Sequence, residues 1–206
     1  MNAGTPTVFL VDDDASFLTS AARLLRASGF SVSTYPSASA LLAGMPADAA
    51  GCVLADLQMP GMNGAELQDA LLTGMNPLPL VFLTGHGEVP DSVRAMRRGA
   101  EDFLTKRAPK EALIEAVRRA LARDTREREE RARRRELRAR FDPLTPRERE
   151  VLAHVLTGQL NKQIAGDLGI DERSVKRHRS SLMVKLQVDS VAALAHLVHE
   201  AGLAPR

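Results

Sequence analysis

The chain has 206 residues, a hydrophobic share of 44% and a formal net charge of +2. This length suits one large domain or two small ones, each able to bury a core. No apolar run approaches transmembrane length and no secretory signal pattern opens the chain, so we expect a cytoplasmic protein without a membrane partner. The single cysteine excludes an internal disulfide framework and a cysteine-rich zinc site.

Charge is unevenly distributed along the chain. Residues 1–107 carry a balance of −4, residues 108–142 a balance of +4, and residues 143–206 a balance of +2. The acidic front indicates a cation site, and the basic rear indicates a polyanionic partner. The excess of either sign is small, so composition alone does not establish nucleic-acid binding.

The first half of the chain alternates short apolar runs with amphipathic helical patterns. The apolar runs lie at 8–11, 32–35, 52–55, 78–83 and 102–104. Runs of this length that are rich in β-branched residues favour buried strands over helices. Five strand–helix units predict an α/β domain with a doubly wound, five-stranded parallel sheet that helices cover on both faces.

Polar residues follow four of these predicted strands. They are Asp12, Asp13, Asp14, Asp56, Thr84 and Lys106. In a parallel sheet, sites form beyond the carboxyl ends of the strands, where these side chains would meet. A carboxylate cluster suits a hard divalent cation such as Mg²⁺, and an aspartate beside it can attack phosphorus. With Lys106 and Thr84 to neutralise phosphoryl charge, the pattern predicts a phosphoryl-transfer site.

Four motifs in this order resemble those of the receiver domains of bacterial two-component response regulators. They are V-D-D-D at 11–14, D-L-Q-M-P-G-M-N-G at 56–64, L-T-G-H-G at 83–87 and G-A-E-D-F-L-T-K at 99–106. The resemblance implies a flavodoxin-like receiver, to which we assign residues 1–120. This sequence departs from the family at Arg107, because many receivers have proline at the position after the lysine.

The resemblance also implies roles for individual residues. Asp56 would be the phosphoacceptor, with a sensor histidine kinase as the donor and Mg²⁺ as the cofactor. The remaining assignments are Asp12, Asp13, Asp56 and the backbone carbonyl of Gln58 as metal ligands, Lys106 as the phosphate-binding ammonium, Thr84 as the switch hydroxyl and Phe103 as the switch aromatic. Asp14 is expected to be a helix N-cap or a solvated neighbour.

Residues 121–142 are dense in charge and contain neither glycine nor large runs of apolar residues. Acids precede bases by four residues, as in Asp124–Arg128 and Glu130–Arg134, an order that stabilises an exposed helix. A solvated linker helix is therefore favoured over a basic nucleic-acid-binding arm. We expect it to continue the last helix of the receiver from Lys110 to Arg140.

Residues 143–206 are predicted to form a small all-α domain of four helices. Thr145 is a predicted N-cap, Pro146 stands at the first helical position, and Glu148 completes a capping box. A second helix fits 161–168 and ends at Gly169; a third begins at Asp171, and a fourth covers 190–201. Short helices joined by a tight turn are typical of a helix-turn-helix.

The third helix has two contrasting faces. Val175, Leu182 and Leu186 form an apolar stripe that should face the domain core. The opposite side carries Arg173, Lys176, Arg177 and Ser180. A face with three cations and no acid suits the major groove of double-stranded DNA, where Arg and Lys reach base edges or phosphates.

This domain resembles the LuxR-type DNA-binding domain. The matching motifs are L-T-P-R-E-R-E-V-L at 144–152, N-K-Q-I-A at 161–165 and S-V-K-R-H-R-S-S-L-M-V-K-L at 174–186. The resemblance implies that Lys176, Arg177 and Ser180 approach base edges. It implies that the phosphate backbone is positioned by Asn161, Lys162, Ser174 and Lys185.

A receiver joined to such a domain resembles the FixJ-like or NarL-like response regulators. This resemblance implies a transcription regulator rather than an enzyme. Such a regulator would bind promoter DNA and form a homodimer when phosphorylated, and RNA polymerase is a candidate partner. An aspartyl-phosphate phosphohydrolase is the alternative. It would leave the helix-turn-helix without a role, and the chain has no D-x-D-x-T nucleophile motif.

Overall fold

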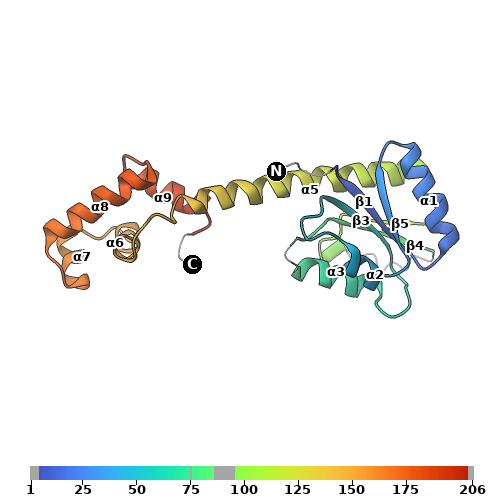
Figure 1. Ribbon diagram of the computed structural model, residues 1–206, viewed down its shortest axis with the longest axis horizontal. Helices are drawn as coiled ribbons and strands as arrows, with labels where there is room; N and C mark the ends of the chain where they lie inside the picture. Colours follow the sequence, from blue (N-terminus) through green and yellow to red (C-terminus); the bar gives the residue numbers. More distant parts are fainter. Residues whose placement is uncertain (1–4, 75, 86–95, 204–206) are drawn as a thin grey trace. The chain divides into compact units, whose positions relative to one another are not determined.

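The structure, a computed structural model, describes residues 5–74, 76–85 and 96–203 (Figure 1). The chain divides into two compact units, Met1–Arg128 and Glu129–Arg206. The stretch expected to be a linker, residues 121–142, is therefore shared between them. Its first part belongs to the receiver unit, and the rest belongs to the C-terminal unit.

The first unit contains a five-stranded sheet. Its strands are β1 (Thr7–Val11), β2 (Ser31–Tyr35), β3 (Gly51–Asp56), β4 (Leu80–Thr84) and β5 (Asp102–Thr105). All pairings are parallel, and the spatial order is β2-β1-β3-β4-β5. The order reverses between β1 and β3, and this confirms the predicted doubly wound sheet.

Helices cover both faces of this sheet (Figure 1). They are α1 (Ala15–Ala27), α2 (Ala38–Gly44), α3 (Gly64–Thr73) and α5 (Lys110–Ala139). Side chains alternate along each strand, so Val8 and Leu10 pack with α1 and α5, while Phe9 and Val11 pack with α2 and α3. Because both of their faces are buried, the central strands β1, β3 and β4 are continuously apolar and carry polar residues only at their ends.

A glycine brings α3 close to the end of β3. A Cβ atom on Gly64 would lie 2.7 Å from the Asp56 carbonyl oxygen and 2.8 Å from Cε1 of Phe82, so no larger residue fits without movement. Asn63 caps this helix and forms a capping box with Glu66. The start of α3 is thereby held against the strand end that carries Asp56.

The long helix α5 has the extent that the sequence predicts, and residues 121–139 are exposed or half-buried as expected, with the exception of Asp124. Asp124 is only 2% exposed, and its Oδ2 accepts the Gly51 N–H at 2.8 Å. Gly51 has a φ of +142°, and a Cβ there would lie 1.8 Å from the Thr7 carbonyl oxygen. Arg128 donates to the Ala49 carbonyl oxygen at 2.7 Å. These contacts join residues far apart in the chain, so the local charge pattern could not indicate them.

The second unit is a bundle built from the last turns of α5 and from α6 (Pro146–Leu156), α7 (Asn161–Leu168), α8 (Glu172–Leu186) and α9 (Val191–Glu200). Leu137 and Phe141 pack into the same core as the four later helices. Arg138 Nε donates to the Ala201 carbonyl oxygen at 2.8 Å. The end of the charged stretch is thus part of this unit.

Local signals place the helices of the second unit. Thr145 and Glu148 form the predicted capping box at the start of α6. Gly169 has a φ of +63°, in the left-handed region that glycine favours, and it ends α7 before Asp171 caps α8. The predicted helix-turn-helix is present.

Among the described residues no single helix is long and apolar enough to cross a membrane; α8 and α9 meet that test only as a pair bent by 53°.

Candidate functional site

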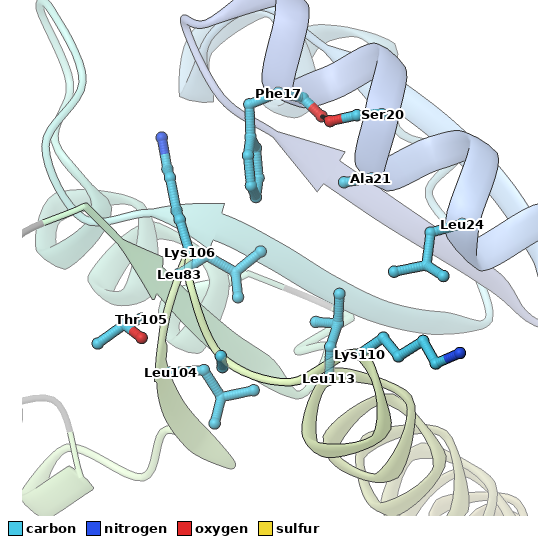
Figure 2. Close-up of a pocket in the computed structure, with 11 residues that line it drawn as sticks. Phe17, Ser20, Ala21, Leu24, Leu83, Leu104, Thr105, Lys106, Lys110 and Leu113 are labelled. Carbon is cyan, nitrogen blue, oxygen red and sulfur yellow. Dashed lines mark hydrogen bonds between the residues drawn. The ribbon is translucent and has the colours of Figure 1, made fainter.

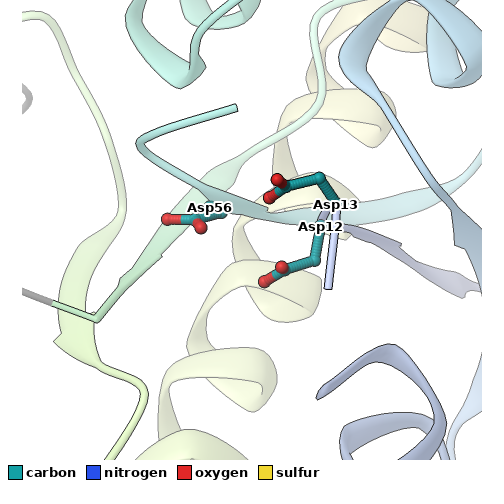
Figure 3. A group of neighbouring side chains, drawn as sticks. All are labelled: Asp12, Asp13 and Asp56. Atoms are coloured by element: carbon teal, nitrogen blue, oxygen red, sulfur yellow. The ribbon is translucent and has the colours of Figure 1, made fainter. Parts of the chain in front are cut away.

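Three carboxylates meet at the carboxyl edge of the sheet. Asp12 and Asp13 follow β1, Asp56 ends β3, and one oxygen of each lies within 4.8 Å of the others (Figure 3). The Asp12 residue is 0% exposed and Asp56 is 7% exposed, whereas Asp13 is open to solvent. The sheet topology therefore creates the acidic cluster that the motifs predict.

One ammonium group faces two of these acids. Lys106 Nζ lies 2.7 Å from Asp12 Oδ2 and 2.8 Å from Asp56 Oδ2. Burial raises the pKa of Asp12, against the lowering effect of hydrogen bonds from Lys106 and from the Asp14 N–H. Burial lowers the pKa of Lys106, but hydrogen bonds to the two carboxylates outweigh it and raise that pKa. The lysine is thus firmly cationic in a cluster with surplus negative charge.

The donor set fits a divalent cation. Three carboxylates and one ammonium leave two negative charges, and ionised carboxylates this deep in a protein require compensation. Hard oxygen ligands at an edge reached by solvent through Asp13 suit Mg²⁺, which retains waters and binds through few carboxylates. Asp12, Asp13 and Asp56 are the residues that would hold it.

The other predicted receiver residues surround this cluster. Gln58 is exposed, and its backbone N–H donates to Asp56 Oδ1 at 3.2 Å. Thr84 is 1% exposed at the end of β4. The half-buried Phe103 ring lies 6.2 Å from the Phe82 ring on the neighbouring strand. The motif at 83–87 continues into residues 86 and 87, which lie outside the described residues.

One neighbour of the cluster was not identified from the sequence. Asp14 is the N-cap of α1, one of the two roles expected for it, and its Oδ1 accepts the N–H of Phe17 at 3.1 Å. The Phe17 ring centroid lies 4.7 Å from Lys106 Nζ. In the sequence Phe17 is one more apolar residue on the core face of a helix, so no local signal distinguishes it.

In the second unit, α8 separates its apolar and cationic faces as predicted. Val175, Leu182 and Leu186 are fully buried. The opposite face, with Arg173, Lys176, Arg177 and Ser180, is exposed. Lys176 Nζ lies 3.1 Å from Glu172 Oε1, an exposed pair one helical turn apart.

The residues expected to contact the phosphate backbone of DNA differ in their surroundings. Lys162 is exposed in the first turn of α7. Asn161 is half-buried, and its Oδ1 accepts a hydrogen bond from Arg179 at 2.7 Å, which leaves the amide NH₂ as the free donor end. The Ser174 hydroxyl donates to Asp171 Oδ2 at 2.7 Å. Arg179, which the sequence reading did not single out, therefore orients Asn161.

Lys185 points toward a buried acid. Its Nζ lies 2.7 Å from Glu148 Oε2 and 3.2 Å from the Pro143 carbonyl oxygen. Glu148 also accepts the Thr145 N–H at 2.8 Å and the Ser181 hydroxyl at 2.6 Å. Burial alone would raise the pKa of Glu148, but hydrogen bonds from Lys185, Ser181 and Thr145 outweigh it and lower the pKa to about 2.

Two family models match the chain, and they cover the two units in order. Residues 8–118 match the response regulator receiver domain, and residues 142–198 match the bacterial regulatory proteins of the luxR family. The chain belongs to the response regulators of two-component systems. Within them it has the FixJ-like arrangement of a receiver followed by a LuxR-type DNA-binding domain.

Relatives of known name share this arrangement over nearly their whole length. The response regulator protein TmoT of Ectopseudomonas mendocina is 38% identical, over 96% of this chain and 90% of its own. The transcriptional regulatory protein FixJ of Azorhizobium caulinodans is 40% identical, over 96% and 94%. The response regulator StyR is similar in structure, with a TM-score of 0.76, 44% identity and coverage of 96% and 100% of the two chains.

Proposed function

We propose that Asp56 accepts a phosphoryl group from a sensor histidine kinase and that this change controls DNA binding by the C-terminal unit. The observation that carries the proposal is the cluster itself. Asp56 is held between two further acids and the Lys106 ammonium, at the edge where the sheet order reverses. In the transfer, an Asp56 carboxylate oxygen forms a bond to phosphorus, and the bond from phosphorus to the donor imidazole nitrogen breaks.

The residues around Asp56 have distinct tasks in this reaction. Lys106 now bridges Asp12 and Asp56, and after transfer its ammonium would bind a phosphoryl oxygen instead. The Thr84 hydroxyl, at the end of the adjacent strand, would donate to another phosphoryl oxygen. A bound Mg²⁺, held by Asp12, Asp13, Asp56 and the Gln58 carbonyl, would supply the positive charge that the cluster lacks.

The phosphoryl group would act on the C-terminal unit through dimerisation. Movement of Thr84 and Lys106 toward the phosphate would draw the half-exposed Phe103 inward and change the surface beside β5. Two receivers would then pair through β5 and the segment before it, which falls largely outside the described residues. A dimer presents two recognition helices to a two-fold site, so it binds DNA more tightly than a monomer does.

The DNA contacts that we propose are on α7 and α8. Lys176, Arg177 and Ser180 would reach base edges, with Arg173 beside them. Asn161, Lys162 and Ser174 would bind phosphates. The exposed cationic face of α8 supports this arrangement, as does the bond from Arg179 to Asn161 Oδ1, which leaves the amide NH₂ of Asn161 as its donor end. Lys185 is also expected to contact the DNA backbone, but its ammonium forms an ion pair with Glu148. Action on promoter DNA would take place in the cytoplasm, and RNA polymerase would be a further partner.

The test of this proposal uses acetyl phosphate and Mg²⁺ as the phosphodonor system. Intact-mass measurement should show one added phosphoryl group on the wild-type protein and none on an Asp56→Asn variant, because the amide is not a nucleophile. Light scattering at matched concentration should show a monomer before phosphorylation and a dimer after it, with tighter operator binding. A phosphorylated Asp56→Asn protein would contradict the assignment, and unchanged mass and affinity would contradict the switch.

A further inference from the structure

The Lys106 ammonium contacts an aromatic ring as well as its two carboxylates. Nζ lies 4.7 Å from the centroid of the Phe17 ring, within the distance at which a ring attracts a cation. The same ammonium binds Asp12 and Asp56 at 2.7 and 2.8 Å. Figure 2 shows the ring of Phe17, on α1, beside the extended lysine chain that leaves the end of β5. The cation is therefore enclosed by two carboxylates and one π face.

The ring is tied to the acidic loop. The backbone N–H of Asp14 donates to Asp12 Oδ1 at 3.0 Å, and Asp14 Oδ1 in turn accepts the N–H of Phe17 at 3.1 Å. A chain of two hydrogen bonds thus links the carboxylate of Asp12 to the backbone that carries the ring. This link fixes the position of the Phe17 backbone relative to the carboxylate of Asp12.

The surroundings make the contact with the ring matter. The Lys106 side chain is 18% exposed, so few waters compete for its ammonium, and a cation–π contact strengthens as water is removed. The ring and the lysine chain both line a cavity of about 210 Å³, whose other walls are mainly apolar side chains that include Leu24, Leu83 and Leu104 (Figure 2). Without the ring this cavity would be wider, and the lysine chain would have room to turn away from the acids.

We propose that Phe17 is a positioning residue for phosphoryl transfer, whose ring holds the Lys106 ammonium where the phosphoryl oxygens of Asp56 will form. This inference rests on the proposed phosphorylation of Asp56. In this role Phe17 acts through the lysine and not on the reacting oxygens. Loss of a cation–π contact of this partly dehydrated kind should slow phosphorylation by about two- to five-fold.

The first test needs no phosphodonor. In the protein without Mg²⁺, NMR should show an upfield ring-current shift of the Lys106 Hε protons, which are next to the Nζ atom that lies over the ring. Phe17→Leu should abolish that shift. Phe30→Leu, the same change at a half-buried phenylalanine of the same core cluster, should retain it. A wild-type protein without the shift would overturn the contact and with it the proposal.

The second test measures the rate of phosphorylation by acetyl phosphate at fixed Mg²⁺. Phe17→Leu should be about two- to five-fold slower than wild type, Phe17→Tyr should be close to wild type, and Phe30→Leu should be unchanged. Fluorinated phenylalanines placed at position 17 are nearly isosteric with phenylalanine, so they preserve folding while weakening the π face. The rate should fall stepwise with the number of fluorines.

The two levels of inference fail differently. A wild-type protein that takes no phosphoryl group overturns the proposed function, and the role of Phe17 falls with it. A wild-type protein that is phosphorylated on Asp56, with equal rates in Phe17→Leu and throughout the fluorinated series, overturns the role of Phe17 alone.

Discussion

In the described part of the molecule, a lysine pairs with a buried carboxylate at two sites, and these sites are built in opposite ways. In the receiver, three acids lie together, the ammonium of Lys106 pairs with Asp12 and Asp56, and burial raises the pKa of Asp12. In the C-terminal unit, Glu148 stands alone and accepts hydrogen bonds from Lys185, Ser181 and Thr145, so its pKa falls to about 2. The first cluster has more charge than its partners can neutralise, and the second is fully satisfied.

The difference shows how the protein separates reaction from support. A satisfied buried anion favours one arrangement of the groups around it, and Glu148 in this way joins the start of α6 to Ser181 and Lys185 on the recognition helix α8. An unsatisfied cluster favours the binding of further groups, which in the function proposed above are a divalent cation and a phosphoryl group. Four predictions test this contrast.

Because the single tyrosine, Tyr35, lies in β2 of the receiver and the chain has no tryptophan, tyrosine fluorescence reports receiver unfolding alone.

The largest effect is expected from removing the lysine of the satisfied site. Lys185→Met would leave Glu148 buried without its cation and should destabilise the C-terminal unit by about 3 kcal/mol. Lys176→Met is the matched control on the same helix. Its exposed pair with Glu172 should be worth less than about 1 kcal/mol. Urea titration followed by circular dichroism at the helix band gives both values, and equal losses would refute the structural role of Lys185.

A second effect, of about 3 kcal/mol, is expected from pH. Glu148 has a folded pKa of about 2, below its ordinary value of 4.5, so its stabilising contribution is complete above pH 4.5 and is lost as pH falls toward 2. The C-terminal unit should therefore lose stability across this window. Glu148→Gln should be less stable at neutral pH and should lack this part of the pH dependence. If the variant and the wild type have the same acid profile, the carboxylate is not the group that titrates.

The cations on the outer face of α8 should affect recognition rather than stability. Lys176→Ala or Arg177→Ala should reduce discrimination between operator and random DNA by about 1–3 kcal/mol. Lys162→Ala should weaken binding to both DNAs and lower the salt slope by about one, because one counterion fewer is released. Lys185→Met, measured where it is folded, should keep the wild-type salt slope. A lower slope in that variant would place Lys185 on the DNA backbone.

The smallest effect is expected at the unsatisfied cluster. Two unit charges 4 Å apart in water repel by about 1 kcal/mol, so Asp13→Asn should stabilise the metal-free receiver by no more than about that amount. Mg²⁺ should stabilise the wild-type receiver and have little effect on this variant. Asp14→Asn removes the same charge, but asparagine also caps helices, so its response to Mg²⁺ should remain. Unfolding followed by Tyr35 fluorescence distinguishes them, and a Mg²⁺ response in Asp13→Asn would exclude it as a ligand.

Much of this molecule is encoded locally and could be predicted for that reason. Buried parallel strands need unbroken apolar runs, and the acids that follow these runs must collect at one edge of the sheet, so the cluster of Asp12, Asp13 and Asp56 follows from order alone. The capping box of Thr145 and Glu148 and the apolar stripe on α8 each lie within one helix. Such signals depend on neighbours within a few residues, which a sequence displays directly.

Other features arose only when distant segments met. Asp124 was read as part of an exposed charged helix, yet it is buried because the tight backbone at Gly51 presents an N–H that needs an acceptor. Lys185 follows the cationic pattern of its helix but turns to Glu148, and Phe17 resembles any core residue until Lys106 lies over its ring. The sequence by itself determined the fold, the family and the acids of the site. The tertiary structure decided which charges are satisfied, because the partner of a buried charge is chosen by proximity in space, and no local pattern records it.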